Sequence, residues 1–341
     1  MDGEGICAGE YMVGTKGINC MSDNILILSC GTRDLLVRYF KRADYERVIG
    51  ADCSELAPAL YEADKYYLIP RMKEEGYFDA ILEICRKEGI TAILPLQEDE
   101  LNLISENREL FEQEGIRTIV SPVETLQICR DKYCFFEHMT EHGIPVLNSY
   151  IDLDKFENAY EAGKIGFPVF VKPVRGAGSV GVMKVSSMEL LKALFAYSEE
   201  PLLIQEFCNG REFGIDVYVD LVSGEVVDIF AKEKLRMRAG ETEKSVTSND
   251  PALKEFVYRA ASTLKLSGPV DMDVFEKDGI FYLSEINPRF GGGFPHAYAC
   301  GVDTPSYILQ NLQGIANESH LQEKREEIYV LKYSDILCID R

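Results

Sequence analysis

The stretch VDMDVFEKDGIFYLSEINPR, residues 270–289, decides how we interpret the rest of this 341-residue chain. Two runs rich in Val, Ile, Phe and Tyr flank the short segment Lys277-Asp278-Gly279. This arrangement predicts a β-hairpin with a three-residue loop, in which Gly279 takes the left-handed position. In that register Glu276 pairs with Ile280 at the base of the loop.

The predicted register brings metal-binding side chains onto one face of the hairpin. Asp273 lies opposite Leu283, so Glu285 falls on the same face at the diagonal position, about 7–8 Å away between backbones. Asn287 keeps to that face, and Mg²⁺ prefers a few hard oxygen ligands plus substrate phosphates to a complete protein cage. We therefore expect Asp273, Glu285 and Asn287 to bind Mg²⁺ or Mn²⁺. Arg289 would stand beside the metal as a fixed cation.

An antiparallel hairpin can also carry carboxylates merely because its outer face meets water. The density of polar residues argues against that interpretation, and Pro288 ends the second strand where the next residue must turn inward. The residues that cluster on one side are Asp271, Asp273, Glu285, Asn287 and Arg289.

The order of residues here resembles the metal signature of a known superfamily. Asp273, then eleven residues, then Glu285-Ile-Asn287-Pro-Arg289 is similar to the signature of the ATP-grasp superfamily, in particular its carbamoyl-phosphate-synthetase-like and biotin-carboxylase-like branches. The resemblance spans roughly residues 22–320. It implies an α/β fold of the α+β ATP-grasp type, in which an N-terminal parallel doubly wound domain precedes two α+β subdomains that clasp ATP.

The resemblance also implies domain boundaries. Residues 1–20 carry five glycines and no apolar period, and we expect a flexible extension over residues 1–21. A Rossmann-like domain is expected over residues 22–125, a small lid subdomain over 126–205 and a large C-terminal subdomain over 206–341.

From Ile25 the chain alternates apolar runs with helical stretches, which is typical of a parallel doubly wound sheet. Such a sheet can bind a dinucleotide, with Asp52 after the second strand as the acid for the ribose. The first turn, Ser29–Arg33, has a single glycine and lacks the repeated glycines of that fingerprint. The segment Pro95–Glu100 either contacts substrate or begins a solvated acidic helix.

A glycine-rich hairpin over residues 167–185 supplies a second motif. Lys172 ends its first strand as a point charge for phosphate, and glycines let backbone N–H groups approach phosphate oxygens closely. The motif is not a P-loop, because no Gly-Lys-Ser/Thr opens a helix. We expect Val169–Val185 to act as a lid that ATP orders. The turn residues expected at the phosphates are Arg175, Gly176, Gly178 and Ser179.

The resemblance extends the nucleotide site to two further segments. Lys132 opens a predicted helix before Gly143-Ile-Pro145, and the superfamily carries a phosphate-binding basic residue at this helix. A strand that breaks at Gly210 makes a natural adenine slot, although an ordinary strand edge would also explain its charges. The residues that the resemblance assigns to adenine and ribose are Glu206, Phe207, Cys208 and Glu212.

For two later segments, the sequence does not decide whether their basic residues contact substrate. Arg236 and Arg238 lie in a mixed-charge run that is either an exposed loop or a contact for the acceptor carboxylate or the triphosphate. His296 follows Gly291–Gly293 in a predicted flexible turn beside the metal, where it could meet substrate.

The composition of the chain excludes several classes of binding partner. A formal net charge of −21 argues against nucleic acid, because such proteins need positive surface to displace counterions. The ten cysteines include no Cys-x-x-Cys pair and there are only four histidines, so neither zinc nor a disulfide framework is indicated. No run of about 18 apolar residues occurs, so we expect no membrane segment. A cytoplasmic location is expected, and a homodimer is left open.

The activity that the resemblance implies is an ATP- and Mg²⁺-dependent carbon–nitrogen ligase. Members of the superfamily transfer the γ-phosphoryl group of ATP to a carboxylate and then let an amine or similar nucleophile displace phosphate. The implied partners are small-molecule carboxylate and amine substrates, with Arg289, Lys172 and Asn287 as catalytic residues. Two alternatives stay open: carbamoyl-phosphate-synthetase-like phosphorylation of bicarbonate or carbamate, and a nucleotide-binding regulatory protein without turnover.

Overall fold

The first sheet of the computed structural model is parallel, as the alternation of apolar and helical runs predicted. The structure describes residues 23–176, 181–238 and 240–339, so the predicted extension 1–21 lies outside it. Strand order is β3-β2-β1-β4-β5. The elements are β1 (Asn24–Leu28), α1 (Asp34–Arg42), β2 (Arg47–Asp52), the 3₁₀ helix η1 (Pro58–Glu62), β3 (Lys65–Leu68), α2 (Tyr77–Glu88), β4 (Ala92–Pro95), α3 (Glu98–Glu106), α4 (Arg108–Gln113) and β5 (Arg117–Thr118).

Both faces of this sheet are buried, which explains the nearly continuous apolar runs of its central strands. Ile25 and Ile27 of β1 pack with α1, whereas Leu26 and Leu28 pack with α2 and α3. Helices on both faces are the arrangement of a doubly wound α/β domain.

A small antiparallel sheet follows, with strand order β6-β9-β7-β8. Asp131 caps the helix before it, because its Oδ1 accepts from the backbone N–H of Tyr133 and Cys134, both at 3.1 Å. Strands β7 and β8 form the predicted glycine-rich hairpin. The elements are α5 (Val123–Arg130), α6 (Lys132–Glu141), β6 (Ser149–Tyr150), α7 (Leu153–Glu161), β7 (Val169–Pro173), β8 (Met183–Val185), α8 (Met188–Tyr197) and β9 (Leu202–Glu206).

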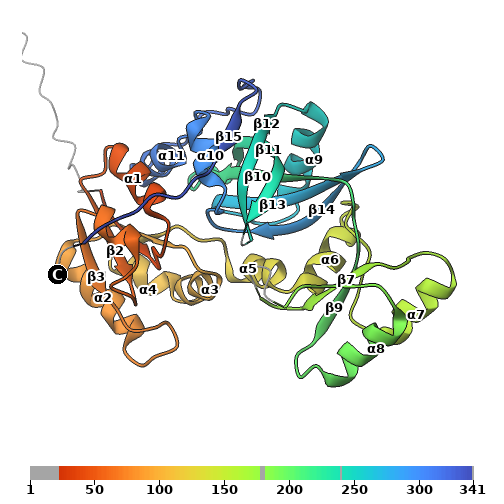
Figure 1. Ribbon diagram of the computed structural model, residues 1–341. Helices are drawn as coiled ribbons and strands as arrows, with labels where there is room; N and C mark the ends of the chain where they lie inside the picture. Colours follow the sequence, from red (N-terminus) through yellow and green to blue (C-terminus); the bar gives the residue numbers. More distant parts are fainter. Residues whose placement is uncertain (1–22, 177–180, 239, 340–341) are drawn as a thin grey trace, which may run out of the picture.

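The third sheet is larger, antiparallel, and ordered β14-β13-β10-β11-β12-β15. Figure 1 shows the three sheets with α5 and α6 lying between the first and the second. The elements are β10 (Arg211–Val219), β11 (Val226–Arg238), β12 (Glu241–Ser248), α9 (Pro251–Ala261), β13 (Gly268–Lys277), β14 (Ile280–Asn287), α10 (Phe294–Ala299), α11 (Thr304–Leu312) and β15 (Tyr329–Leu331).

The predicted register of the β13–β14 hairpin is wrong in its loop. Lys277 pairs with Ile280, so the turn has two residues, Asp278 and Gly279, with φ angles of +55° and +76°. Positive φ at both central residues is the type I′ geometry that an Asp-Gly pair favours, because its twist matches that of the strands.

A β-bulge in β14 compensates for the shorter turn. The ladder pairs Val274 with Leu283 and then Asp273 with Glu285, which leaves Ser284 as the extra residue. Leu283 is also tied from outside the hairpin, because its N–H donates to the Pro145 carbonyl at 2.9 Å. Asp273 and Glu285 are therefore direct neighbours and not diagonal ones, and they share the face that the sequence predicted.

Aromatic side chains join the first sheet to the end of the third. Phe40 of α1 meets Phe290 edge-on with ring centroids 5.9 Å apart, and Phe290 meets Phe294 at 4.6 Å. Tyr39 stacks on Tyr298 with centroids 3.7 Å apart. These residues belong to one buried core that spans α1 and α10, so the N-terminal sheet is packed firmly against the segment that follows β14.

The three sheets are separated by the segments 119–148 and 207–210. We keep the boundaries at 125/126 and 205/206 as a proposal. Over the described residues, no helix combines the length and the apolar character that crossing a bilayer requires.

Phe290→Ala is expected to lower the free energy of unfolding by about 3–5 kcal/mol, because the ring is 2% exposed and its loss leaves a cavity between α1 and α10. Urea denaturation measures this change. Tyr197→Ala is the control, since Tyr197 is 89% exposed and its removal should cost less than about 0.5 kcal/mol. Equal stability of the two variants would show that the aromatic contacts do not hold the sheets together.

Candidate active site

One face of the large sheet carries a row of acidic and amide side chains. Asp273 pairs with Glu285, and Asp271 pairs with Asn287 further along the same face. Asn287 Nδ2 donates to Glu285 Oε1 at 3.1 Å and lies 3.5 Å from Asp271 Oδ2. The alternate residues of β13 are buried on the other face: Val270, Met272 and Val274. The structure thus brings the three predicted metal ligands together.

Lys234 of β11 reaches across β10 to this acidic row. Its Nζ lies 2.6 Å from Asp273 Oδ1 and 2.8 Å from Glu212 Oε1, and its side chain is 6% exposed. The side chain crosses at Gly214, where a Cβ atom would lie 3.0 Å from Lys234 Cε. Glycine leaves the space that the lysine needs, so a cation is fixed against the central carboxylate of the row.

The carboxylates of this face outnumber the cations that pair with them closely. Burial raises the pKa of Asp273 above its usual range; Lys234 lowers it, and Asp271 and Glu285 raise it further. Burial lowers the pKa of Lys234, but Asp273 and Glu212 outweigh that effect and raise it. A face with this charge pattern favours a further cation.

The donor set fits a hard divalent cation. Carboxylate and amide oxygens at Asp273, Glu285 and Asn287 are of the type that Mg²⁺ and Mn²⁺ prefer. Across the described ranges, no group of three or more His, Cys, Asp or Glu side chains is arranged to hold an ion alone. A bound Mg²⁺ would therefore need additional oxygens, such as those of substrate phosphates.

Two lysines from α6 and β7 face the acidic row. Lys172 Nζ donates to Gln205 Oε1 at 2.9 Å, and Lys132 Nζ donates to the Gly176 carbonyl at 2.7 Å. Burial lowers the pKa of Lys172 to about 8, while attraction to Glu285 opposes the shift. The same two effects act on Lys132, and burial lowers its pKa as well. Glu285 is thus within electrostatic range of both lysines, and the small and large sheets converge on one polar region.

The glycine-rich turn is described in part. Arg175 is exposed, and its Nε lies 3.2 Å from the carboxylate that caps α6. Gly176 has a φ of +134°, which few residues other than glycine adopt. Gly178 and Ser179 lie outside the described residues. Phosphate contacts by this turn, and its closure as a lid, stay predictions.

The strand break predicted as the adenine slot lies between β9 and β10. Glu206 ends β9, and its carboxylate accepts from Asn148 Nδ2 at 2.7 Å and lies 3.5 Å from Lys277 Nζ. Gly210 lies against β13, since a Cβ atom there would be 1.9 Å from the Glu276 carbonyl oxygen. Only glycine fits this contact, so the break ties the small sheet closely to the hairpin.

The other predicted hinge residues differ in exposure. Lys184 Nζ lies 3.9 Å from the centroid of the Phe207 ring, a cation–π contact. Cys208 is buried, so contact with a nucleotide would use its backbone. Glu212 pairs with Lys234 and keeps 30% of its side chain exposed. Their contacts with adenine and ribose stay a prediction.

Arg289 stands at the end of the acidic row. Its Nη1 lies 3.6 Å from Asp271 Oδ2 and donates to the Phe290 carbonyl at 3.1 Å. His296 is 1% exposed inside α10, where its Nδ1 bonds the Ser245 hydroxyl. Burial lowers the pKa of His296 to about 4, so its imidazole is neutral at ordinary pH. His296 is therefore a core residue and does not lie in the flexible turn that the preceding glycines suggested.

Strand β11 contacts the site through lysines that the sequence analysis did not single out. Arg236 and Arg238 are 63% and 72% exposed and pair with an acidic side chain of β12. Lys232 is 1% exposed and pairs with Asp216, the β10 residue that lies opposite Asp271 in the ladder. The signal was available, since Lys232 directly follows a largely apolar strand run, the position of a buried residue.

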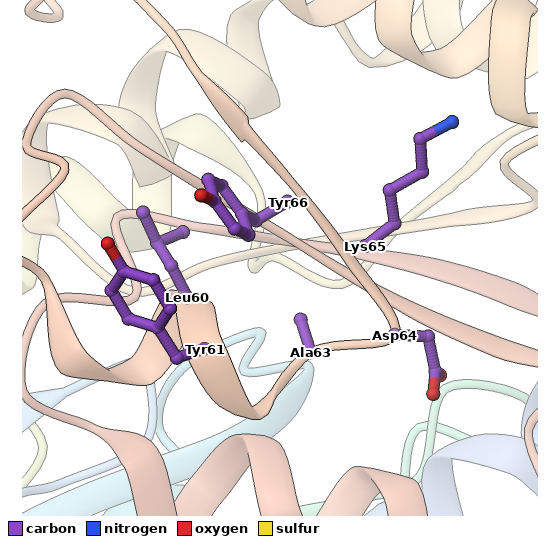
Figure 2. Close-up of a pocket in the computed structure, with 6 residues that line it drawn as sticks. All are labelled: Leu60, Tyr61, Ala63, Asp64, Lys65 and Tyr66. Carbon is purple, nitrogen blue, oxygen red and sulfur yellow. The ribbon is translucent and has the colours of Figure 1, made fainter. Parts of the chain in front are cut away.

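Figure 2 shows a surface hollow away from these residues, beside the edge strand β3. Its charged residues have partners: Asp64 lies 2.9 Å from Lys41, and Lys65 lies 2.7 Å from Glu88. We assign it no role in the site. Its lining residues are Leu60, Tyr61, Ala63, Asp64, Lys65 and Tyr66.

Two family models match parts of this chain. Residues 25–119 match the model described as "PylC-like, N-terminal domain". Residues 198–336 match the model described as "ATP-grasp in the biosynthetic pathway with Ter operon". The second range contains the complete acidic row and the strand break between β9 and β10.

Similar proteins come from several enzyme groups. The D-alanine–D-alanine ligase of Ruminiclostridium cellulolyticum is 31% identical over 64% of this chain and 66% of its own length. The arginine-specific carbamoyl phosphate synthase large chain of Bacillus subtilis is 27% identical over 53% of this chain, but the match spans only 18% of the synthase. The biotin carboxylase domain dimer of Hydrogenobacter thermophilus 2-oxoglutarate carboxylase, solved with MgADP and bicarbonate, has a TM-score of 0.70 at 20% identity, covering 88% of this chain and 72% of that one.

Lys234→Met is expected to lower stability by about 3 kcal/mol, because Asp273 and Glu212 lose the cation between them. Adding MgCl₂ should raise the melting temperature of the variant more than that of the wild type, since a divalent ion can replace the missing charge. Thermal unfolding with and without MgCl₂ measures both effects.

Lys265→Met is the matched control for this experiment, since Lys265 is exposed. It should change stability by less than about 0.5 kcal/mol. If Lys234→Met and the wild type respond equally to MgCl₂, the assignment of a cation to this face is wrong.

Proposed function

Because this chain belongs to the ATP-grasp superfamily, we propose that it is an ATP- and Mg²⁺-dependent ligase that activates a carboxylate as an acyl phosphate and couples it to an amine or similar nucleophile. The observation that carries the proposal is the row of Asp273, Glu285 and Asn287 on one face of the β13–β14 hairpin. The electrostatic interaction of Lys132 and Lys172 with Glu285 supports it. The cations that we assign to the phosphates come from α6 and β7, and the carboxylates that we assign to the metal come from β13 and β14. A nucleoside triphosphate with its cation needs both.

The nucleotide would lie between the small and large sheets. The adenine is assigned to the strand break, where backbone groups of Glu206, Phe207 and Cys208 border it. Glu212 would accept from the ribose hydroxyls. Lys132, Lys172, Arg175 and the turn with Gly176, Gly178 and Ser179 would receive the phosphates.

Asp273, Glu285 and Asn287 would hold Mg²⁺ or Mn²⁺, which when bound neutralises negative charge on the phosphate oxygens. Lys172 and Arg289 act as fixed cations where charge develops during transfer of the γ-phosphoryl group, and their positions are set before the reaction begins. The carboxylate oxygen of the substrate attacks the γ-phosphorus, so no covalent intermediate on the protein is needed. An amine then attacks the acyl carbon and phosphate leaves.

The partners we assign are a small-molecule carboxylate and an amine. The likeness to a D-alanine–D-alanine ligase supports this choice, because that enzyme is named for the ligation of two amino acids. A homodimer stays a proposal, supported by the dimer recorded for the biotin carboxylase domain. Phosphorylation of bicarbonate or carbamate is the second candidate, favoured by the likeness to carbamoyl phosphate synthase.

ADP release, assayed with mixtures of amino acids and separately with bicarbonate, tests the proposal. We expect release that needs both Mg²⁺ and an amino acid mixture. Release that depends on bicarbonate alone would favour the second candidate. Tight ATP binding with no release under any condition would contradict both.

Glu285→Gln should remove Mg²⁺-dependent turnover, by about 100-fold or more, while the fold stays intact, because the change keeps shape but deletes a charge that the cation needs. Steady-state ADP release at saturating ATP measures the effect. Glu276→Gln is the matched control on the same hairpin, where the carboxylate pairs with Arg211 at 2.9 Å. Near-normal turnover by Glu285→Gln would overturn the metal assignment.

Lys172→Ala should weaken ATP affinity or phosphoryl transfer by about 10- to 1000-fold, through loss of one preorganised charge. The pKa of Lys172 near 8 adds a pH effect: its charge is lost as pH rises, so wild-type affinity for MgADP should fall between about pH 7 and 9. Lys172→Arg keeps its charge and should lack this fall. Calorimetry across pH measures it, with exposed Lys155→Ala as control. Unchanged kinetics and affinity in Lys172→Ala would place the lysine outside the nucleotide site.

A further inference from the structure

Arg33 brings a second arginine toward the acidic row from the N-terminal sheet. It is the N-cap residue of α1, in the loop that follows β1, and its guanidinium is half-buried. The one hydrogen bond recorded for its side chain within the described ranges runs from Nη1 to the Leu96 carbonyl at 3.3 Å. Both the β1 loop and the β4 loop lie at the carboxyl edge of a parallel sheet, at the point where strand order reverses, which is where such sheets bind ligands.

The position of Arg33 relative to Arg289 is fixed by packing. Arg33 begins α1, and Phe40 of that helix meets Phe290, the residue directly after Arg289, with ring centroids 5.9 Å apart. Tyr39 meets Phe294 at 6.2 Å. The backbone segments that carry the two arginines are therefore joined through one aromatic core.

The two arginines carry two positive charges but have only one carboxylate partner between them among the described residues. Burial lowers the pKa of Arg33, and the positive charge of Arg289 is the next largest cause. Among the described residues, no carboxylate lies within ion-pair distance, 4.0 Å, of Arg33, and Arg289 reaches only Asp271, at 3.6 Å. Arg38 of the same helix differs, since it pairs with Glu62 at 2.8 Å in solvent.

The acidic groups that face Arg33 have partners of their own. Asp271 interacts with Arg289 and Asn287. Glu241 pairs with Lys332, and its carboxylate lies against the glycine loop, since a Cβ atom on Gly292 would be 3.0 Å from Glu241 Cδ. A partly buried cation pair beside carboxylates that are already paired favours a planar, bidentate anion from outside the chain.

We propose that Arg33 and Arg289 together bind a carboxylate of the acceptor substrate, with Arg33 as the contribution of the N-terminal sheet to the acceptor site. The inference rests on the proposed ligase function for the identity of the anion as a substrate group. A phosphate is the less suitable occupant, because the phosphate-directed Lys132 and Lys172 act at Glu285, whose pair with Asp273 lies two residues along the hairpin from the pair of Asp271 and Asn287. Two residues along a strand span about 7 Å, so a carboxylate at the arginines lies next to the phosphates and does not coincide with them.

Sodium acetate is the probe, titrated calorimetrically into the full chain saturated with MgADP, against sodium chloride at equal ionic strength. Arg33→Gln should weaken acetate binding by about 10- to 100-fold, because charge-assisted hydrogen bonds to the carboxylate are lost. Its affinity for MgADP should equal that of the wild type. Arg38→Gln is the matched control, because Arg38 lies on the same helix five residues after Arg33 and its side chain is 43% exposed. This variant should bind both ligands normally.

Arg33→Lys keeps a charge and should restore part of the acetate affinity, which guards against a loss caused only by misfolding. Equal acetate affinity in Arg33→Gln and the wild type would overturn the inference, as would a wild type that binds MgADP but no acetate. In both cases the nucleotide site stands. A wild type that does not bind MgADP would contradict the proposed function, and the acceptor assignment would fall with it.

Discussion

The pairing of Asp273 with Glu285 across the β13–β14 hairpin is the constraint on which the site depends. A two-residue turn alone would set Asp273 opposite Ser284 and turn Glu285 toward the core, because side chains alternate along a strand. The bulge at Ser284 returns Glu285 to the polar face. The remaining contacts follow from this pairing: Lys234 reaches Asp273, and Asn287 reaches Glu285. Lys132 of α6 and Lys172 of β7 interact electrostatically with the same Glu285 carboxylate.

Glycine and aromatic residues then fix three sheets around that pair. Gly214 lets Lys234 cross β10, and Gly210 allows the strand break to touch β13. The ring of Phe290 ties the far end of the acidic row to α1. Close backbone approach and aromatic packing both fix the positions of charged side chains before a ligand binds.

Much of this arrangement could be predicted from the sequence, because it follows from local patterns of apolar and polar residues. Features that depend on contacts between distant segments could not be predicted. Apolar runs buried on both faces identify the parallel sheet, and period-two alternation places Asp273 and Glu285 on one face. The loop length and the bulge could not be predicted, because the bulge forms where the Pro145 carbonyl binds Leu283, a contact between distant segments. The predicted face of Glu285 was nevertheless correct, because the turn is one residue shorter than predicted and the bulge adds one residue to β14.

Residues whose roles arise from tertiary packing were the ones missed. In the sequence, Arg236 and Arg238 look like Lys232 and Lys234, members of one basic run. The arginines nevertheless meet solvent, whereas Lys234 pairs with Asp273 and Lys232 is buried against Asp216. Arg33 lies in a loop remote in sequence from the metal segment, so only the packing of α1 on α10 connects them.

Transfer of a carboxylate oxygen to phosphate is the chemical event that the account requires, and isotope labelling measures it most directly. The chain would be incubated with Mg-ATP and a mixture of amino acids labelled with ¹⁸O in their carboxyl groups, and the inorganic phosphate analysed by mass spectrometry. Activation of the carboxylate predicts one ¹⁸O atom in the phosphate for each ADP formed, because the oxygen that attacks the γ-phosphorus leaves with it. ADP formation with unlabelled phosphate would contradict it, since water would then be the acceptor.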